Sequence, residues 1–256
     1  MKRRQFLNKT TTTLAAAAAI PISHVAASNA AIGTEKEKEL YEIRTYELKF
    51  GGNAKLLINY LKEALQPALS RAGSNQFMLF DEVGNSDPKK IWALISYPNA
   101  ASYIQAQSLK TDTDFIAAAA AYTASEKAIY NRFTSSLLLA FDGLPQMMKP
   151  VDDASVFELR TYEGYSEDAV GRKINMFNKE EIPLFKEVGL NPVFFGEMIA
   201  GPYRPCLTYL LNFKDMKAHG EAWEKFIASP EWNTMKVKKE YANTVSNIRK
   251  VFLKPI

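Results

Sequence analysis

The stretch Tyr41-Glu42-Ile43-Arg44-Thr45-Tyr46-Glu47-Leu48 recurs in altered form 116 positions later, as Phe157-Glu158-Leu159-Arg160-Thr161-Tyr162-Glu163. Each copy opens a segment of domain size. Self-similarity at this spacing indicates a repeated structural unit. The sequence therefore predicts a first repeat over residues 40–141, a linker over 142–154 and a second repeat over 155–256.

The two repeats share one expected order of elements. Each opening copy is rich in aromatic and β-branched residues, which favour a strand, and apolar residues at helical spacing follow it. In the first repeat we expect a strand at 41–48, a helix at 56–73, strands at 77–83 and 91–97, a helical region at 100–127 and a strand at 133–141. In the second we expect a strand at 156–163, a helix at 167–188, strands at 193–199 and 206–213, a helical region at 215–242 and a strand at 245–253. Pro230 is expected to split the last helical region, since proline suits the start of a helix and not its interior.

This βαββαβ order predicts an α+β fold. Such a unit, called ferredoxin-like, forms a four-stranded antiparallel sheet with both helices on one face. The other face carries too many apolar side chains to remain in water. We expect the two sheets to pack face to face within one chain as a dimeric α/β barrel, with the helices outside. Pairing between chains, as a homo-oligomer, is the competing arrangement.

The first 30 residues are typical of an export signal. A basic start precedes the apolar stretch Leu14 to Val25, and small residues suited to a signal peptidase follow at Ala27 and Ala30. The order Arg3-Arg4-Gln5-Phe6-Leu7-Asn8-Lys9 resembles the twin-arginine (Tat) motif of bacterial signals, with the lysine one place late. The apolar stretch is shorter than the about 20 residues of a membrane span. We expect a periplasmic or otherwise exported protein without a stable membrane span, and a flexible leader over 31–39.

Charge and cysteine content narrow the classes of partner. The formal charge of +4 comes from four basic residues in the first 30 positions, which hold no acid. The remaining chain is balanced, so it has no broad electrostatic attraction for nucleic acid or an anionic membrane. Cys206 is the only cysteine, which excludes an intrachain disulfide.

Two motifs resemble the NIPSNAP family. One is the Glu-(Ile/Leu)-Arg-Thr-Tyr-Glu that opens both repeats. The other is Ala222-Trp223-Glu224-Lys225-Phe226-Ile227-Ala228-Ser229-Pro230-Glu231-Trp232, close to that family's Trp-x-x-Phe-x-x-(Asp/Ser)-Pro-Glu-Trp pattern. The resemblance covers about residues 40–256 and is better in the second repeat, since the first has Asp114-Phe115 in place of Glu231-Trp232 and no equivalent of Trp223. It implies a dimeric α/β barrel, a fold that hosts monooxygenases, haem-handling enzymes, isomerases and binding proteins.

The opening strands carry the residues with the most chemistry. Side chains alternate between the faces of a strand, so Glu42, Arg44 and Tyr46 share one face and Tyr41, Ile43 and Thr45 share the other. We expect the apolar set under the helices and the Glu/Arg/Tyr set between the two sheets. The candidate ligand-binding residues are Glu42, Arg44, Tyr46, Glu158, Arg160, Tyr162 and Trp92.

Two interpretations of this set stay open. Charges are costly to bury unless they are paired, so the Glu and Arg can form a structural ion pair that fixes the sheets. In a ligand site, the arginine would instead hold an anionic group, with the tyrosine as a hydrogen-bond partner and the glutamate as a base. In the ligand-site interpretation Trp92 lines the same space, and in the ion-pair interpretation it is simply a core residue.

The remaining chemistry is limited. Beyond the predicted signal, His219 is the only histidine, so with one cysteine a tetrahedral N/S zinc site within the chain is excluded. No Gly-x-Ser-x-Gly, Gly-x-Gly-x-x-Gly or Gly-Lys-Ser/Thr occurs. We expect no metal and no cofactor. His219 is expected on a helix surface, with a haem ligand as the alternative, and Trp223 and Trp232 are expected to pack a helix on the sheet or to gate an opening.

The sequence thus favours a protein that binds a small, partly apolar molecule between its two sheets. The alternatives are a cofactor-independent oxygenase or isomerase that uses Arg44 or Arg160, and a haem-binding protein.

Overall fold

The computed structural model describes residues 37–84 and 86–256. The predicted signal at 1–30, with Arg3 and Arg4, and residues 31–36 of the predicted leader lie outside these ranges. Over the described ranges, every helix is too short or too polar to cross a lipid bilayer.

The predicted order of strands and helices is confirmed in both repeats. The first consists of β1 (Leu40–Leu48), α1 (Ala54–Asn59), the π-helical segment η1 (Tyr60–Leu65), α2 (Gln66–Arg71), β2 (Gln76–Glu82), β3 (Lys90–Tyr97), α3 (Ala100–Gln105), the 3₁₀ turn η2 (Leu109–Thr111), α4 (Thr113–Ala118), α5 (Ala120–Thr123) and β4 (Tyr130–Ala140). The second consists of β5 (Val156–Glu163), α6 (Glu167–Met176), the π-helical segment η3 (Phe177–Glu181), α7 (Ile182–Val188), β6 (Asn191–Ala200), β7 (Cys206–Phe213), α8 (Met216–Ala228), α9 (Pro230–Met235), the 3₁₀ turn η4 (Lys239–Tyr241) and β8 (Asn247–Pro255). The break at Pro230 is also as predicted: Ser229 accepts a hydrogen bond from the Trp232 amide and begins α9.

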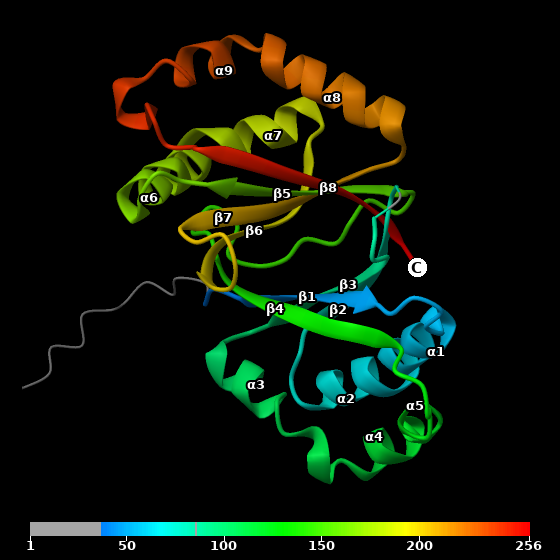
Figure 1. Ribbon diagram of the computed structural model, residues 1–256. Coiled ribbons are helices and arrows are strands. Elements are labelled where there is room, and N and C mark those ends of the chain that lie inside the picture. The colour runs from blue at the N-terminus through cyan, green and yellow to red at the C-terminus, as the bar shows by residue number, and fades with distance from the viewer. Residues whose placement is uncertain (1–36, 85) are drawn as a thin grey trace, which may run out of the picture. The chain divides into compact units, whose positions relative to one another are not determined.

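The strands form one closed antiparallel barrel in the order β1-β3-β2-β8-β5-β7-β6-β4. Each repeat contributes a four-stranded sheet, and the sheets join where β2 pairs with β8 and β4 pairs with β6. Figure 1 shows the helices of each repeat on the outer side of its own sheet. The α+β fold and the dimeric α/β barrel are therefore confirmed, and one chain supplies both halves of the barrel.

One junction between the sheets depends on a glycine. A Cβ atom at Gly196 of β6 would lie 2.7 Å from the Cβ of Leu138 on β4, closer than side chains approach. Glycine therefore allows β6 to pair with β4 along this edge.

Three apolar clusters make up the core. One lies inside the barrel and contains Tyr41, Ile43, Phe157 and Leu159. The other two lie between each sheet and its helices, and they contain Tyr46 and Tyr162 respectively.

The predicted orientation of the opening strands is therefore wrong. The apolar set faces the barrel interior, and the Glu/Arg/Tyr set lies beneath the helices. Alternation along a strand fixes which side chains share a face and leaves open which face turns inward. The narrow interior receives side chains from both sheets and takes mainly apolar ones, whereas the helix side adds polar partners for the buried charges.

Candidate functional site

The interior of the barrel is nearly full. A cavity of about 10 Å³ among its side chains has room for at most one water molecule. Trp92, Phe80 and Leu94 line it, so the predicted position of Trp92 between the sheets is correct. The Trp92 indole Nε1 donates to Glu82 Oε2 at 3.0 Å. The predicted ligand site between the two sheets is therefore wrong, because apolar side chains already fill that space.

In the first repeat, Glu42 and Arg44 of the Glu/Arg/Tyr set form an ion pair whose hydrogen bonds stay within one sheet. Arg44 donates from Nε and Nη2 to the two carboxylate oxygens of Glu42, at 2.8 and 2.9 Å. Tyr97 OH and Ser135 Oγ donate to the same carboxylate at 3.1 and 2.7 Å. Arg44 lies on the same strand as Glu42, and Tyr97 and Ser135 lie on the neighbouring strands β3 and β4 of the same sheet. The charge on Glu42 is thus satisfied without any residue from a helix, which matches the structural interpretation of the set.

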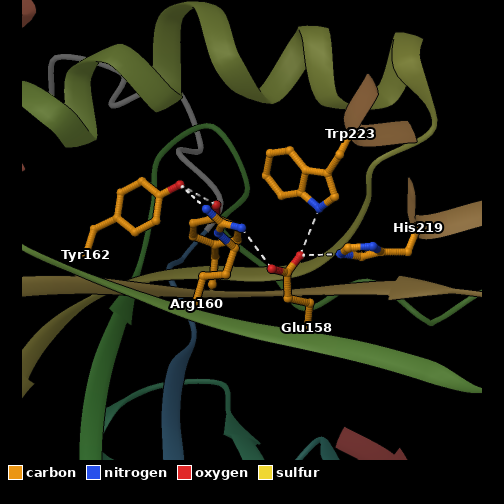
Figure 2. Close-up of polar contacts among 6 residues, drawn as sticks. Glu158, Arg160, Tyr162, His219 and Trp223 are labelled. Carbon is orange, nitrogen blue, oxygen red and sulfur yellow. Dashed lines mark hydrogen bonds and ion pairs between the residues drawn. The ribbon is translucent and has the colours of Figure 1, made fainter. Parts of the chain in front are cut away.

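The second repeat begins with the same three residues. Arg160 Nη1 donates to Glu158 Oε1 at 2.8 Å, and Nη2 donates to the Tyr162 hydroxyl at 3.1 Å. Tyr209 OH, from β7, donates to the Tyr162 hydroxyl at 2.9 Å. The side chain of Glu158 is only 1 % exposed. Figure 2 shows this row of polar contacts along the helix-facing side of the strand.

Helix α8 completes the second network. Trp223 Nε1 donates to Glu158 Oε2 at 2.9 Å, and His219 Nε2 lies 3.1 Å from the same oxygen (Figure 2). The Trp223 ring also covers the Arg160 guanidinium, whose Cζ is 4.5 Å from the ring centroid. His219 therefore contributes to the buried network and is not a residue of the helix surface. The spacing of four between His219 and Trp223, which places both on one helix face, is a sequence signal for this arrangement.

Sequence differences between the repeats explain why a helix takes part in the second network and not in the first. Phe213 stands 116 positions after Tyr97 and has no hydroxyl to give to Glu158. Lys250 faces Arg160 across the strand pair where the first repeat has Ser135 opposite Arg44. Glu158 thus takes its additional hydrogen bonds from α8 and not from its own sheet.

A second buried ion pair belongs only to the second repeat. Lys173 of α6 and Glu181 of η3 pair directly, and the two residues are 5 % and 2 % exposed. Burial raises the pKa of Glu181, an effect that Lys173 opposes. The first repeat has Leu57 and Leu65 at the matching positions, 116 residues earlier. Apolar periodicity does not reveal this pair, but a comparison of the two repeats position by position contains a signal for it.

Both ion pairs line a pocket of about 500 Å³ between the second sheet and the helices α8 and α9. Its walls are mostly aromatic and aliphatic, with contributions from Trp223, Phe226, Trp232, Ile248 and Phe252. At the position matching Ile248, the first repeat has Phe133, which packs on Tyr46 with ring centroids 5.1 Å apart. The second repeat is thus open where Phe133 covers the first network.

The geometry does not fit haem ligation by His219. Its Nε2 is already engaged with Glu158, and the ring is enclosed by Phe213 and Phe252 at centroid distances of 4.9 and 5.3 Å. Among residues 37–84 and 86–256, no group of three or more His, Cys, Asp or Glu side chains is placed to hold a metal ion.

Among the comparisons with known proteins, one family model matches the second repeat. Residues 157–256 match the NIPSNAP family model. None of the curated proteins compared with the chain matches it.

Two of the solved structures share the architecture of both repeats. A candidate monooxygenase from Lactobacillus acidophilus NCFM is 12 % identical with a TM-score of 0.56, over 86 % of this chain and 94 % of that one. A candidate monooxygenase from Fusobacterium nucleatum is 9 % identical with a TM-score of 0.53, over 85 % and 92 %. A NIPSNAP-like domain protein from Burkholderia xenovorans is 19 % identical with a TM-score of 0.36, over 40 % and 84 %. At such identities the two monooxygenase-like structures show a common fold and nothing about the reaction.

Proposed function

We propose that the protein binds a small, partly apolar molecule in the pocket of its second repeat. The match of residues 157–256 to the NIPSNAP family model, within a dimeric α/β barrel, is compatible with this role. The observation that carries this proposal is the contrast between the repeats. The first closes its ion pair within one sheet, whereas the second exposes the matching face to a pocket beneath α8 and α9.

The buried charges of the second repeat support a functional role for its pocket. Ion pairs in a core are often no more stable than well-packed apolar residues of similar volume. The first repeat, with Leu57 and Leu65 in place of Lys173 and Glu181, shows that this fold packs without the second pair. The pocket's size and its aromatic walls with a few convergent polar groups are typical of ligand sites, which measure about 300–1,000 Å³.

The test is native mass spectrometry of the full chain, produced in a bacterium that has the twin-arginine machinery. We expect protein that carries an added small mass. Ile248→Phe copies Phe133 of the first repeat and is expected to remove that mass, because the larger ring fills the pocket. Ile199→Phe, at an exposed strand position outside the pocket, is the control and is expected to retain it. A wild-type spectrum without added mass, or an adduct that survives Ile248→Phe, contradicts the proposal.

We also propose that the protein is exported through the twin-arginine route, on the support of Arg3-Arg4 followed by Phe6-Leu7. The same spectra report the polypeptide mass. We expect the wild type to have lost the residues up to Ala27 or Ala30, and an Arg3→Lys, Arg4→Lys variant to retain them. An uncleaved wild-type chain is the contrary result.

A cofactor-independent oxygenase or isomerase is the second candidate function. It is favoured by the carboxylate–imidazole contact of Glu158 and His219 at the pocket wall, since such a pair can hold or move a proton. If the adduct identified by mass spectrometry is a substrate, the isolated protein converts it and His219→Gln does so more slowly. Release of the adduct unchanged in both proteins contradicts an enzymatic role.

A further inference from the structure

The lining of the second-repeat pocket specifies the charge of its ligand. Resting on the binding function proposed above, we infer that the ligand is an amphipathic anion, with a carboxylate or similar group beside Lys250 and an apolar body against the aromatic wall. Three observations support this: the balance of charge, the register of β5 and β8, and the side chains on either side of Lys250.

The lining carries a surplus of positive charge. Its cations are Arg160, Lys173 and Lys250, and its carboxylates are Glu158 and Glu181. Glu158 is paired with Arg160, and Glu181 is paired with Lys173. Over the described part of the chain, Lys250 forms no ion pair. Its ammonium is thus available to an anion, while both carboxylates are already neutralised by their own partners.

The register of the strands places like charges side by side. Lys250 lies directly opposite Arg160 in the antiparallel pair of β5 and β8. Side chains directly opposite one another have Cβ atoms about 4.5–5.5 Å apart, and like charges there are destabilising. The first repeat has Ser135 opposite Arg44, so it lacks this repulsion. An anion bound beside Lys250 would offset the unfavourable pairing that the second repeat retains.

The remainder of the pocket is suited to an apolar body. Ile248 and Phe252 flank Lys250 on the same face of β8, and Trp223, Phe226 and Trp232 line the opposite side from α8 and α9. A cationic ligand would be repelled by Lys250, and a wholly polar one would leave the aromatic wall without an apolar partner. An aromatic or aliphatic carboxylate satisfies both parts of the lining.

Two probes of the same shape test this inference: 2-naphthoate, which is an anion, and 2-naphthamide, which is neutral. Binding is followed through quenching of tryptophan fluorescence, because two of the protein's three tryptophans line the pocket. A charge-assisted hydrogen bond predicts an affinity for naphthoate that is about tenfold higher at low salt. That advantage is expected to shrink as the ionic strength rises.

Lys250→Met separates the charge from the shape of the site. The variant is expected to lose the preference for naphthoate, through about a tenfold rise in its Kd, and to bind naphthamide as the wild type does. Lys254→Met is the matched control, since Lys254 is an exposed lysine of the same strand that lies outside the pocket. It is expected to keep the preference.

The outcomes distinguish this inference from the proposed function. Equal affinities of the wild type for both probes, or a preference that survives Lys250→Met, overturn the anion inference and leave the pocket as a neutral binding site. Quenching by neither probe contradicts both the anion inference and the binding function.

Discussion

Arg160→Met is expected to lower the free energy of unfolding by about 3–5 kcal/mol, because it leaves a buried carboxylate without its cation. Glu158 is 1 % exposed and would retain only His219 and Trp223 as partners. Urea unfolding measures the effect. Arg249→Met is the control: the arginine side chain is 45 % exposed in its pair with Glu163, so its loss is expected to cost about 0–1 kcal/mol.

A second substitution tests whether the missing cation is the cause. Glu158→Gln removes the charge but leaves an amide oxygen that can still accept from Trp223 Nε1. In the Arg160→Met background it is expected to restore most of the lost stability, and the double-mutant cycle gives the coupling of the pair. If Arg160→Met unfolds at the same urea concentration as the wild type, that result would falsify the structural assignment. Arg160 would then act in binding or catalysis alone.

Lys173→Met is also expected to lower the free energy of unfolding by about 3–5 kcal/mol, because Glu181 is then buried without a partner. The effect depends on pH. Burial already holds the native pKa of Glu181 above its ordinary 4.5. As the pH rises, the unfolded state therefore releases this proton first, and the free energy of unfolding falls between 4.5 and the raised native pKa. Urea unfolding at a series of pH values is thus expected to show that the stability lost through Lys173→Met grows as the pH rises from 4.5.

The first repeat supplies the replacement for this pair. Lys173→Leu combined with Glu181→Leu copies Leu57 and Leu65, and it is expected to leave the stability unchanged or to raise it by about 1–4 kcal/mol. Lys179→Met, an exposed lysine of the same helical segment, serves as the control with little effect. If the Leu/Leu variant also retains the bound mass seen by native spectrometry, the ion pair contributes to packing alone.

The architecture was predictable because its causes are local. The repeat of Glu-(Ile/Leu)-Arg-Thr-Tyr-Glu identifies the duplication, and apolar spacing separates strands from helices. Pro230 and Ser229 fix a helix boundary within a few residues of chain. The apolar face that a βαββαβ sheet leaves free of helices requires a cover, and the second copy in the same chain provides it.

The candidate site was predictable only in part. Glu158, Arg160 and Tyr162 follow one another at every second position of one strand, so their shared face can be read directly from the sequence. They are joined by His219 and Trp223 from α8, Lys173 from α6 and Glu181 from η3. Their contribution depends on how those helices pack across the sheet, which is not encoded at short range.

The sequence by itself determined the duplication and the order of the elements, because periodicity and turn residues act over short distances. That the two sheets pair within one chain, and not between chains, was decided by the tertiary structure. Only the tertiary structure decided which face of β1 and β5 turns into the barrel, since alternation is equally compatible with both orientations. It also decided that Glu42 is satisfied by Tyr97 and Ser135, whereas Glu158 reaches α8. That difference depends on strand register and helix packing, and it leaves the second repeat with the pocket.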